Sequence, residues 1–442
     1  MRPSRHSSNP RLLIIAPAWN QGWWGGGKVL APPLVLPLLA GLTPPDFDIS
    51  LVDENVEPVD TNAAADLVAL SCMTASAPRA YAIADAFRER GIPVVIGGIH
   101  PTIMPDEAAC HADAVVIGEA EPVWKKVLAD FAAGRLRPRY SNDGYANLTG
   151  LPHPRRDLLQ VHRYLTTNVV QTARGCPNNC SFCIVGTVAG RKVRFRPVEE
   201  VVEEVRPLHG WIGFVDDNIT GHPRRAKNLF KALIPLKRRW VGQADLTMAE
   251  DSELMKLAVR SGCKAMFIGL ESLSQENLRA THKMPNVGID MDEAITKIHQ
   301  AGIEIIGSFV LGLDGDDRGT FERTVAFAER HKLAAAQFAV LTPFPGTAMR
   351  KQLEKEGRIL DNDWSDYTMS NVVFRPRQMT PCDLNEGQAY AYGRFYSIPS
   401  ILKRCLTWRG LRRGNVALPF MVNISYRKIH RHQKVATWLT SA

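Results

Sequence analysis

Short apolar runs alternate with helical patterns through the first third of the chain. Residues 11–16 read Arg-Leu-Leu-Ile-Ile-Ala. Comparable runs follow at residues 49–53, 67–71, 93–98 and 114–118. Such runs, bounded by turn residues, are typical of buried parallel strands. Between them, residues 33–42 repeat Leu on one helical face, and residues 78–90 form another helical stretch. This order predicts an α/β fold that begins with a Rossmann-like, doubly wound sheet over residues 11–137.

The alternation pauses at residues 138–164, which are rich in Pro, Gly, Asn and Arg and are predicted to be a linker. Six further strands are then predicted, at residues 169–173, 211–215, 240–246, 265–270, 303–311 and 336–341. A closed α/β barrel has eight βα units. Residues 165–350 are therefore predicted to form a partial (β/α)6 barrel. Over residues 351–442 the alternation of strands and helices stops, which indicates a small, mainly helical C-terminal domain with a basic tail.

Composition supports a globular protein of about three domains. Of the 442 residues, 45% are hydrophobic and 22% are charged, so disorder is not the default expectation. The eight cysteines show no regular framework outside one cluster, and no secretory segment is evident. We therefore expect a reducing cytoplasm. The apolar run at residues 29–42 contains three prolines and is too short to span a bilayer.

Residues 174–183, Arg-Gly-Cys-Pro-Asn-Asn-Cys-Ser-Phe-Cys, bring three thiols together: Cys176, Cys180 and Cys183. Cys thiolates hold [4Fe–4S] clusters, and three ligands leave one iron open for a substrate or cofactor. Structural zinc requires four closed ligands, and no fourth Cys or His lies at ligand spacing. Disulfide pairing would leave one Cys over. The three cysteines are therefore predicted to be the metal ligands of a catalytic iron–sulfur cluster.

This spacing, with Phe182 before the last cysteine, resembles the signature of radical SAM enzymes. The resemblance implies that S-adenosylmethionine (SAM) chelates the open iron of a [4Fe–4S] cluster. It also implies that one electron from an external reductant cleaves SAM to a 5′-deoxyadenosyl radical. Because chemistry in α/β barrels lies at the carboxyl ends of the strands, the residues there are the candidates for binding SAM.

Seven residues at these strand ends are predicted to contact SAM: Asp216, Asp217, Gln243, Glu271, Ser272, Ser308 and Thr342. The adjacent aspartates stand where the family usually carries a Gly-Gly-Glu-like segment for the methionine amino group, so the sequence departs from the pattern there. The Glu-Ser pair resembles the segment near the SAM ribose and carboxylate. The last two belong to segments that resemble the adenosine side of the pocket, although Gly and Pro in such segments also simply turn the chain.

A second set of small or polar residues follows the strands of the first domain: Ser71, Met73, Thr74, Gly97, Gly98, Gly118 and Glu119. Open α/β sheets bind ligands at this edge, although turn geometry also accounts for the glycines. The runs at residues 97–102 and 118–121 resemble the cobalamin-binding domain that precedes many radical SAM domains. The resemblance implies that the seven residues contact a corrinoid, but the same fold also occurs without one. An Asp-x-His-x-x-Gly motif is absent, and His100 is predicted to be a hydrogen-bonded loop residue.

The C-terminal region carries an aromatic helix and a basic tail. The spacing of the aromatic residues favours the core over a substrate platform: Tyr390, Tyr392, Phe395 and Tyr396. The tail from Lys403 to Lys434, which includes Arg404, is compatible with a solvated face, a membrane surface or nucleic acid. No RNA-binding module is apparent, so no nucleic acid is expected. The region resembles the C-terminal domain of cobalamin-dependent radical SAM proteins such as hopanoid-type methylases, which implies a part that selects the substrate.

Together these patterns predict a cobalamin-dependent radical SAM enzyme that methylates an unactivated carbon of a small-molecule or lipid substrate. Its cofactors would be a [4Fe–4S] cluster, SAM and cobalamin, which carry the difficult chemistry. A radical SAM cyclase or rearrangement enzyme, with or without cobalamin, is the nearest alternative. An iron–sulfur or lipid-surface binding protein without turnover is an alternative of another class. We expect a cytoplasmic protein whose basic tail contacts membrane surfaces peripherally.

Overall fold

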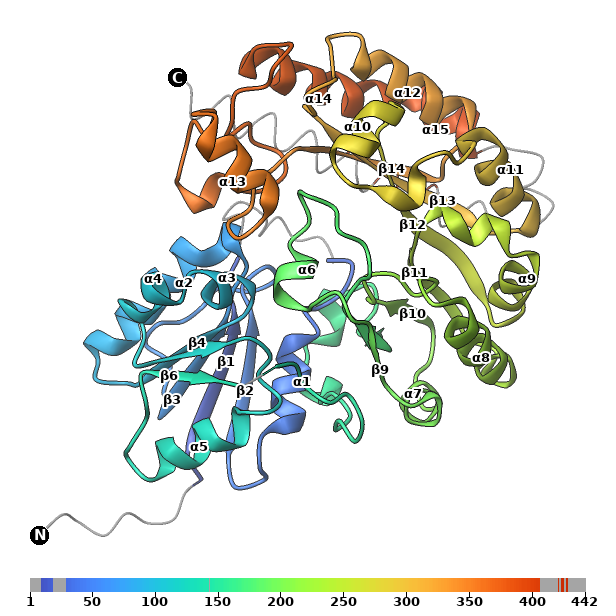
Figure 1. Cartoon of the computed structure of the whole chain (residues 1–442). Coiled ribbons are helices and arrows are strands. Elements are labelled where there is room, and N and C mark those ends of the chain that lie inside the picture. The colour runs from blue at the N-terminus through green and yellow to red at the C-terminus, as the bar shows by residue number, and fades with distance from the viewer. Residues whose placement is uncertain are drawn as a thin grey trace, which may run out of the picture. The chain divides into compact units, whose positions relative to one another are not determined.

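The structure, a computed structural model, describes residues 9–18, 29–142, 144–405, 420, 423, 424 and 427 (Figure 1). These residues form two compact units. The first contains the described residues up to Gly175, together with Thr187–Gly213 and Asp363–Ser365. The second contains Cys176–Gly186, Phe214–Asn362 and the described residues from Asp366 onward. The chain therefore passes between the units several times, and the predicted domain ranges stay a prediction.

The first unit is built on a six-stranded parallel sheet. Its strands are β1 (Arg11–Ala16), β2 (Asp48–Asp53), β3 (Leu67–Ser71), β4 (Val94–Gly97), β5 (Ala114–Ile117) and β6 (Arg139–Ser141). Their order is β2-β1-β3-β4-β5-β6, and all pairs are parallel. Since β2 and β3 lie on opposite sides of β1, the order reverses there, and such switch points bind ligands. The predicted Rossmann-like sheet is confirmed, with β6 added from within the predicted linker.

Helices cover both faces of this sheet (Figure 1). The helices of the unit are α1 (Val35–Leu42), α2 (Ala77–Glu89), α3 (Ile99–Ile103), α4 (Pro105–Ala109), α5 (Trp124–Ala132) and α7 (Val198–Val205). Along β1, Leu12 and Ile14 are buried with α1 and α5, whereas Leu13 and Ile15 are buried with α2. Successive strand residues point to opposite faces. A sheet covered on both faces therefore needs the continuous apolar runs seen in the sequence.

Four neighbouring parallel strands form the core of the second unit: β11 (Arg239–Ala244), β12 (Cys263–Glu271), β13 (Glu304–Leu311) and β14 (Ala335–Val340). Its helices are α8 (Pro223–Leu233), α9 (Ser252–Arg260), α10 (Gln275–Ala280), α11 (Met291–Ala301), α12 (Thr320–Arg330), α13 (Ala348–Lys355), α14 (Pro381–Phe395) and α15 (Ile398–Cys405). The other described strands are β7 (Val169–Val170), β8 (Ala173–Arg174), β9 (Arg194–Phe195) and β10 (Trp211–Phe214), and the remaining α-helix is α6 (Val185–Val188). All six strands predicted for the barrel are present.

The two faces of the second sheet differ in burial. On one face, Ile268, Ile305 and Phe338 are fully buried. The opposite face carries side chains that are only half-buried: Gln243, Phe267, Ile306, Ser308 and Gln337. The register places these five beside one another across β11–β14. In α/β barrels the helices cover the outer face, so the half-buried set marks the inner face.

The C-terminal helix α14 and the residue after it pack along β14, the edge strand of this sheet. The hydroxyl of Tyr396 donates to a β14 carbonyl at 2.7 Å and accepts from the amide of the same residue at 3.1 Å. Tyr392 and Phe395 meet the ring of Phe338 edge-on. The core position predicted for Phe395 and Tyr396 is confirmed, whereas Tyr392 is half-buried and Tyr390 is 46% exposed.

Arg404 corrects one part of the predicted basic tail, because it is buried rather than presented to a partner. Its guanidinium donates to the carbonyls of Leu333 and Phe395, each at 2.8 Å, and lies 3.5 Å from the centre of the Phe395 ring. Burial lowers the pKa of Arg404 to about 10. Arg404 is not part of the basic surface because it lies on the buried side of α15. Beyond residue 405, the tail lies outside the described residues except at positions 420, 423, 424 and 427.

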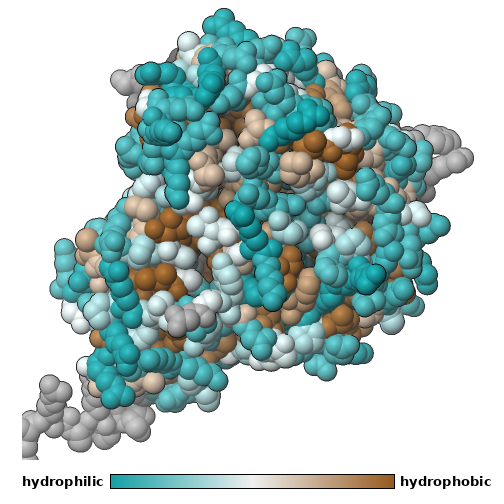
Figure 2. All heavy atoms as spheres, in the orientation of Figure 1, coloured by the Kyte–Doolittle hydropathy of each residue, from teal (hydrophilic) through white to brown (hydrophobic). Residues whose placement is uncertain are grey.

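The surface of the molecule is mostly hydrophilic on the face drawn in Figure 2, where hydrophobic side chains emerge in small separate patches. Scattered apolar residues of this kind are normal for a protein surface. Among the described residues, no helix combines the length and the apolar character needed to cross a membrane.

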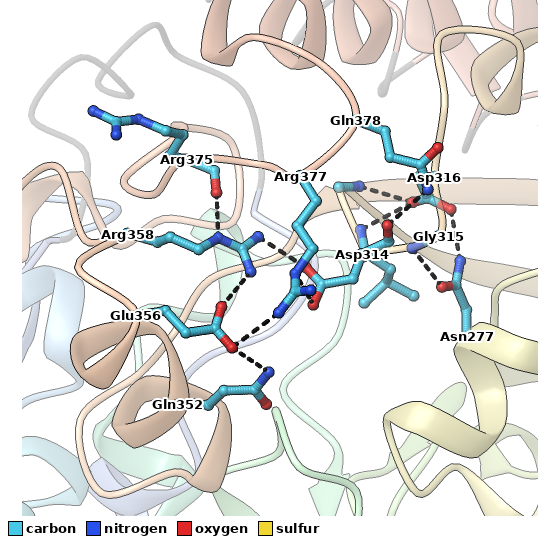
Figure 3. A network of polar contacts seen from close by, with 12 residues as sticks. Asn277, Asp314, Gly315, Asp316, Gln352, Glu356, Arg358, Arg375, Arg377 and Gln378 are labelled. Atoms are coloured by element: carbon cyan, nitrogen blue, oxygen red, sulfur yellow. Dashed lines mark hydrogen bonds and ion pairs between the residues drawn. The ribbon is translucent and has the colours of Figure 1, made fainter.

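A buried polar network holds the loop that follows β13 (Figure 3). Asp316 accepts hydrogen bonds from the amides of Gly312 and Leu313 at 2.9 and 3.0 Å, and from the side chain of Asn277 at 2.8 Å. Ion pairs beside it tie the loop to the chain that follows α13: Asp314, Glu356, Arg358 and Arg377. The network therefore stabilises the end of the β13 segment, in which Ser308 is a predicted SAM contact.

We expect Asp316→Asn to remove a pH dependence of stability. Burial raises the pKa of Asp316 to about 6, against opposing hydrogen bonds from the loop amides, whereas an Asp in the unfolded chain titrates at about 3.9. The folded state thus holds the proton more tightly, so this contribution is present at low pH and is lost as the pH rises through about 6. Between about pH 4 and 7.5, the wild type should lose roughly 2–3 kcal/mol of unfolding free energy that the variant keeps.

Urea unfolding at several pH values measures this difference. Asp317→Asn is the matched control, because a hydrogen bond from Arg323 lowers the pKa of Asp317 and its pH effect has the opposite sign. Identical pH profiles for the wild type and Asp316→Asn would show that the buried carboxyl titrates normally.

Candidate active site

The cysteine loop begins at a glycine that no other residue can replace without displacement of its neighbours. Gly175 has φ +91°, and a Cβ there would lie 2.8, 2.9 and 3.1 Å from the carbonyl oxygens of Lys192, Gly190 and Ala189. Both the left-handed backbone and the missing side chain are therefore required. This close approach sets the point at which the chain leaves β8 and enters the loop.

The loop is anchored by backbone hydrogen bonds on both of its sides within the second unit. The amide of Ser181 donates to the carbonyl of Thr281 at 2.9 Å, and the carbonyl of Ser181 accepts from the amide of Met349, also at 2.9 Å. The amide of Cys183 donates to the carbonyl of Cys180 at 3.1 Å. The backbone around the three cysteines is thus held by residues that follow β12 and β14.

The three thiols are half-buried and lie near enough for the charge on one to affect the pKa of another. Burial raises the pKa of Cys176, Cys180 and Cys183, that of Cys180 to about 11, and the charge of Lys283 opposes the rise at each of them. None of the three is in a disulfide. Without iron they are therefore neutral thiols at neutral pH, and binding of a metal cluster would release their protons.

Among the residues that the structure describes, no three His, Cys, Asp or Glu side chains converge as they would around a single metal ion. The cysteines of a four-iron cube bind different iron atoms, so their sulfurs are expected to stand apart. Three thiols on one loop, in mutual electrostatic contact and close to a lysine, therefore fit a cluster better than a lone ion.

Lys283 is the site residue that sequence analysis missed. Its ammonium is 2.8 Å from Oε1 of Glu271, and a Cβ on Gly269 would lie 2.2 Å from that oxygen and 2.8 Å from the Lys283 nitrogen. Burial alone would lower the pKa of Lys283, but the charges of Glu271 and Cys180 raise it above its usual value. The lysine is thus a half-buried cation beside the cysteines.

Glu271 is also held in an unusual backbone conformation. Its φ is +63°, and the pairing of β12 with β13 shifts register between Gly269 and Glu271. A non-glycine residue in the left-handed region costs energy and is often a functional position. The predicted SAM contact at the end of β12 therefore has a geometric peculiarity that the sequence does not show.

One carboxylate that follows β10 and one that follows β11 lie near the first cysteine. Burial raises the pKa of Cys176, and the charges of Asp217 and Asp245 raise it further. Asp245 also accepts from the side-chain amide of Asn218 at 2.6 Å, and Asp216 is buried. The structure thus brings both Asp217 and Asp245 to the cysteine loop, while Gln243 lies on the inner face.

The three predicted hydroxyl contacts differ in their surroundings. The oxygen of Ser272 accepts from the amide of Ser274 at 3.2 Å and from the side chain of Asn277 at 3.3 Å. Thr342 is buried and donates to the carbonyl of Val340 at 3.1 Å. Ser308 is half-buried on the inner face beside Gly269. Of the three, Ser308 is placed best to meet a ligand.

The strand ends of the first unit show both close packing and open space. A Cβ on Gly98, whose φ is +108°, would lie 2.6 Å from the carbonyl oxygen of Cys72, and one on Gly97 would lie 3.4 Å from Val116. Gly118, with φ +84°, has no heavy atom within 4 Å of that position. Ser71 is half-buried there. Turn geometry explains Gly98, whereas the open position at Gly118 is one that a bound ligand could use.

Glu119, predicted to contact a corrinoid, lies within a cluster of ion pairs. Arg194 donates to its two carboxylate oxygens at 2.7 and 2.8 Å, and Arg174 lies 3.2 Å away and also pairs with Glu121. Burial acts in the other direction, but the hydrogen bonds from Arg194 hold the pKa of Glu119 below its usual range. The carboxylate therefore fastens β5 to the chain just before the cysteines, and a cofactor contact stays a prediction.

Comparison with known proteins shows which families match these two parts of the chain. Residues 170–328 match the radical SAM superfamily, and residues 31–128 match the B12 binding domain. The bacteriochlorophyllide d C-8(2)-methyltransferase of Chlorobaculum tepidum is 30% identical over 84% of this chain and 87% of its own. The chain belongs to the B12-binding group of the radical SAM superfamily. The hopanoid C-2 methylase of Rhodopseudomonas palustris is 27% identical over 85% of this chain and 75% of its own.

The fold of this radical SAM protein has a solved counterpart. OxsB, a cobalamin-dependent SAM radical enzyme solved with aqua-cobalamin and S-adenosylmethionine bound, gives a TM-score of 0.69 at 15% identity, over 96% of this chain and 71% of that one. The predicted family, α/β fold, enzyme class and cofactor set are confirmed by the family matches. The roles of individual residues remain predictions.

Proposed function

We propose that this radical SAM enzyme transfers a methyl group to an unactivated carbon of a hydrophobic, ring-containing small molecule. The observation that carries the substrate class is the inner face of the second sheet, where half-buried Phe267 and Ile306 lie between the neutral amides of Gln243 and Gln337. Such a lining binds an uncharged ring system by contact area and a few hydrogen bonds. The bacteriochlorophyllide and hopanoid enzymes among the relatives support this choice.

The residues of the second unit would hold the cluster and SAM. When bound, these groups supply a radical that removes a substrate hydrogen, and cobalamin supplies the methyl group. Cys176, Cys180 and Cys183 would bind the irons, and the Lys283 cation would balance part of the thiolate charge. The carboxylates of Asp217 and Asp245 would attract the positive groups of SAM, since opposite charges attract strongly where water is scarce.

The residues of the first unit would receive the corrinoid at the carboxyl ends of its strands. Gly118 leaves open space there, and Met73 exposes 53% of its side chain just after β3. Both positions fit an extended planar ligand resting on the edge of the sheet. His100 does not fit as a cobalt ligand, because its side chain is fully buried and lies within hydrogen-bonding distance of Glu107.

The function is tested with protein purified without oxygen after expression with cobalamin supplied. We expect the chain to carry a corrinoid and an iron–sulfur cluster. With a one-electron reductant and SAM that bears a trideuteromethyl group, bacteriochlorophyllide d and a hopanoid are offered separately. A product heavier by one such methyl group, together with 5′-deoxyadenosine and S-adenosylhomocysteine, would support methyl transfer.

The other outcomes decide against it. Formation of 5′-deoxyadenosine without S-adenosylhomocysteine would favour a cyclase or rearrangement enzyme. A chain that holds a cluster but no corrinoid would overturn the methyltransferase proposal. Absence of both SAM products under reducing conditions would favour a binding protein without turnover.

We also propose a cytoplasmic location with peripheral membrane contact through the basic tail. Support comes from the exposed Lys403 on α15 and from the basic and aromatic residues that follow in the sequence, a combination found at membrane surfaces. Absence of binding to vesicles that contain anionic lipid would remove the membrane part of this proposal.

A further inference from the structure

A short segment from late in the sequence belongs to the B12-binding unit. Asp363–Ser365 is part of the first unit, although the residues on either side of it belong to the second. Within this segment Trp364 is half-buried. Its indole nitrogen donates to Oε2 of Glu107 at 3.0 Å, and its ring meets the ring of His100 edge-on with centroids 5.3 Å apart. One tryptophan thus contacts two side chains that follow β4.

His100 carries this contact onward to the end of β3. Its side chain is fully buried, and burial lowers the pKa of His100, so the ring is neutral at neutral pH. Its Nε2 lies 3.2 Å from Oε1 of Glu107, and its Nδ1 lies 3.4 Å from the hydroxyl of Thr74. The tautomer that satisfies both donates from Nε2 to the carboxylate and accepts from Thr74 at Nδ1. A continuous chain of polar contacts therefore runs from Trp364 to Thr74.

Thr74 stands next to the most exposed residue of the predicted corrinoid site. Thr74 itself is 2% exposed, whereas the neighbouring Met73 is 53% exposed. A second contact holds this turn: the backbone amide of Met73 donates a hydrogen bond to the hydroxyl of Ser76 at 3.2 Å. The turn at Met73 is thus held by Ser76 and continues into Thr74, whose hydroxyl lies 3.4 Å from Nδ1 of the His100 ring that Trp364 contacts.

We propose that Trp364 is a positioning residue for cobalamin binding, which acts through Glu107 and His100 on the turn that contains Met73 and Thr74. This inference rests on the proposed function, because it presupposes a corrinoid at this edge of the sheet. A fully satisfied buried network holds its members in one arrangement. A loop that is ordered beforehand loses less conformational freedom when its ligand binds, so affinity rises.

The test compares the affinity of Trp364→Phe and the wild type for hydroxocobalamin. Full-length protein that carries its iron–sulfur cluster but no corrinoid is titrated, and the visible absorbance of the bound corrinoid is followed. Phe keeps a ring beside His100 but cannot donate to Glu107. A hydrogen bond to a charged group contributes about 1.5–3 kcal/mol to ordering this network before the ligand binds. Without it, that order must be recovered on binding, so we expect binding to weaken by on the order of tenfold. Iron content and melting temperature are measured on the same samples.

The matched control is Trp211→Phe, which removes an indole N–H at the start of β10 in the same unit and should leave the affinity unchanged. If Trp364→Phe binds hydroxocobalamin within about twofold of the wild type, the inference is wrong, since a tenfold change corresponds to about 1.4 kcal/mol. It is also wrong if affinity falls only together with melting temperature and iron content. A wild-type chain that binds no corrinoid would overturn the proposed function and this inference together, whereas equal affinities overturn the inference alone.

Discussion

Lys283→Gln is expected to reduce the formation of 5′-deoxyadenosine by on the order of a hundredfold, as is typical when a preorganised charge is removed from an active site. The variant loses the cation that lies beside all three cysteines. It also leaves Glu271, which is 7% exposed, without the ammonium 2.8 Å away. Breaking a buried pair in this way costs about 3–5 kcal/mol. The rate of SAM cleavage measured without oxygen and the unfolding free energy measured in urea should therefore both fall.

The double variant Glu271→Gln/Lys283→Gln separates the two effects. It removes both charges, so the unfolding free energy should return most of the way to the wild-type value. SAM cleavage should stay low, because the cysteines still lack their cation. Recovery of both quantities would show that the pair is only structural. Lys227→Gln is the matched control, since its ion pair with Glu253 has the same 2.8 Å separation but lies at the surface, where water screens the two charges.

Gly175→Ala is expected to prevent assembly of the iron–sulfur cluster. The new methyl group would meet three carbonyl oxygens at 2.8–3.1 Å, and an L-residue at φ +91° adds about 1–2 kcal/mol of backbone strain. Together with overpacking, we expect a loss of about 3–5 kcal/mol in stability and a displaced cysteine loop. Iron and sulfide content of anaerobically purified protein measures the effect directly.

Gly210→Ala distinguishes packing from backbone strain. Gly210 has a similar φ of +86°, but no heavy atom lies within 4 Å of the position that a Cβ would take. This variant should lose only about 1–2 kcal/mol and keep its cluster. If Gly175→Ala and Gly210→Ala retain equal amounts of iron, the close approach at Gly175 is not what holds the cysteine loop.

The strands were predicted well because their signal is local. The run at residues 11–16 coincides with β1, and the run at 303–311 differs from β13 by one residue. A sheet that is buried on both faces requires continuous apolar side chains, and that requirement is visible in any window of the sequence. Short elements such as α10 carry too few residues to establish a period, so pattern alone does not reveal them.

The partners of polar groups could not be predicted in the same way, because residues far apart in the sequence become neighbours only in the folded chain. Nothing in the sequence indicated that Arg174 and Arg194, which follow Glu119 by 55 and 75 positions, pair with its carboxylate. Arg404 was counted with a basic surface, yet it lies over the ring of Phe395. In both cases the residue type was evident from the sequence, whereas its neighbour was not.

The sequence by itself determined the fold class, the three cysteines of the loop and the family, because periodicity and ligand spacing are properties of neighbouring residues. Only the tertiary structure decided that Lys283 stands beside those cysteines and that Trp364 reaches Glu107, 257 positions away. The reason is physical: a charge or a hydrogen-bond donor acts over a few ångströms in space, and only the packing of the sheets and helices brings such distant residues within that range.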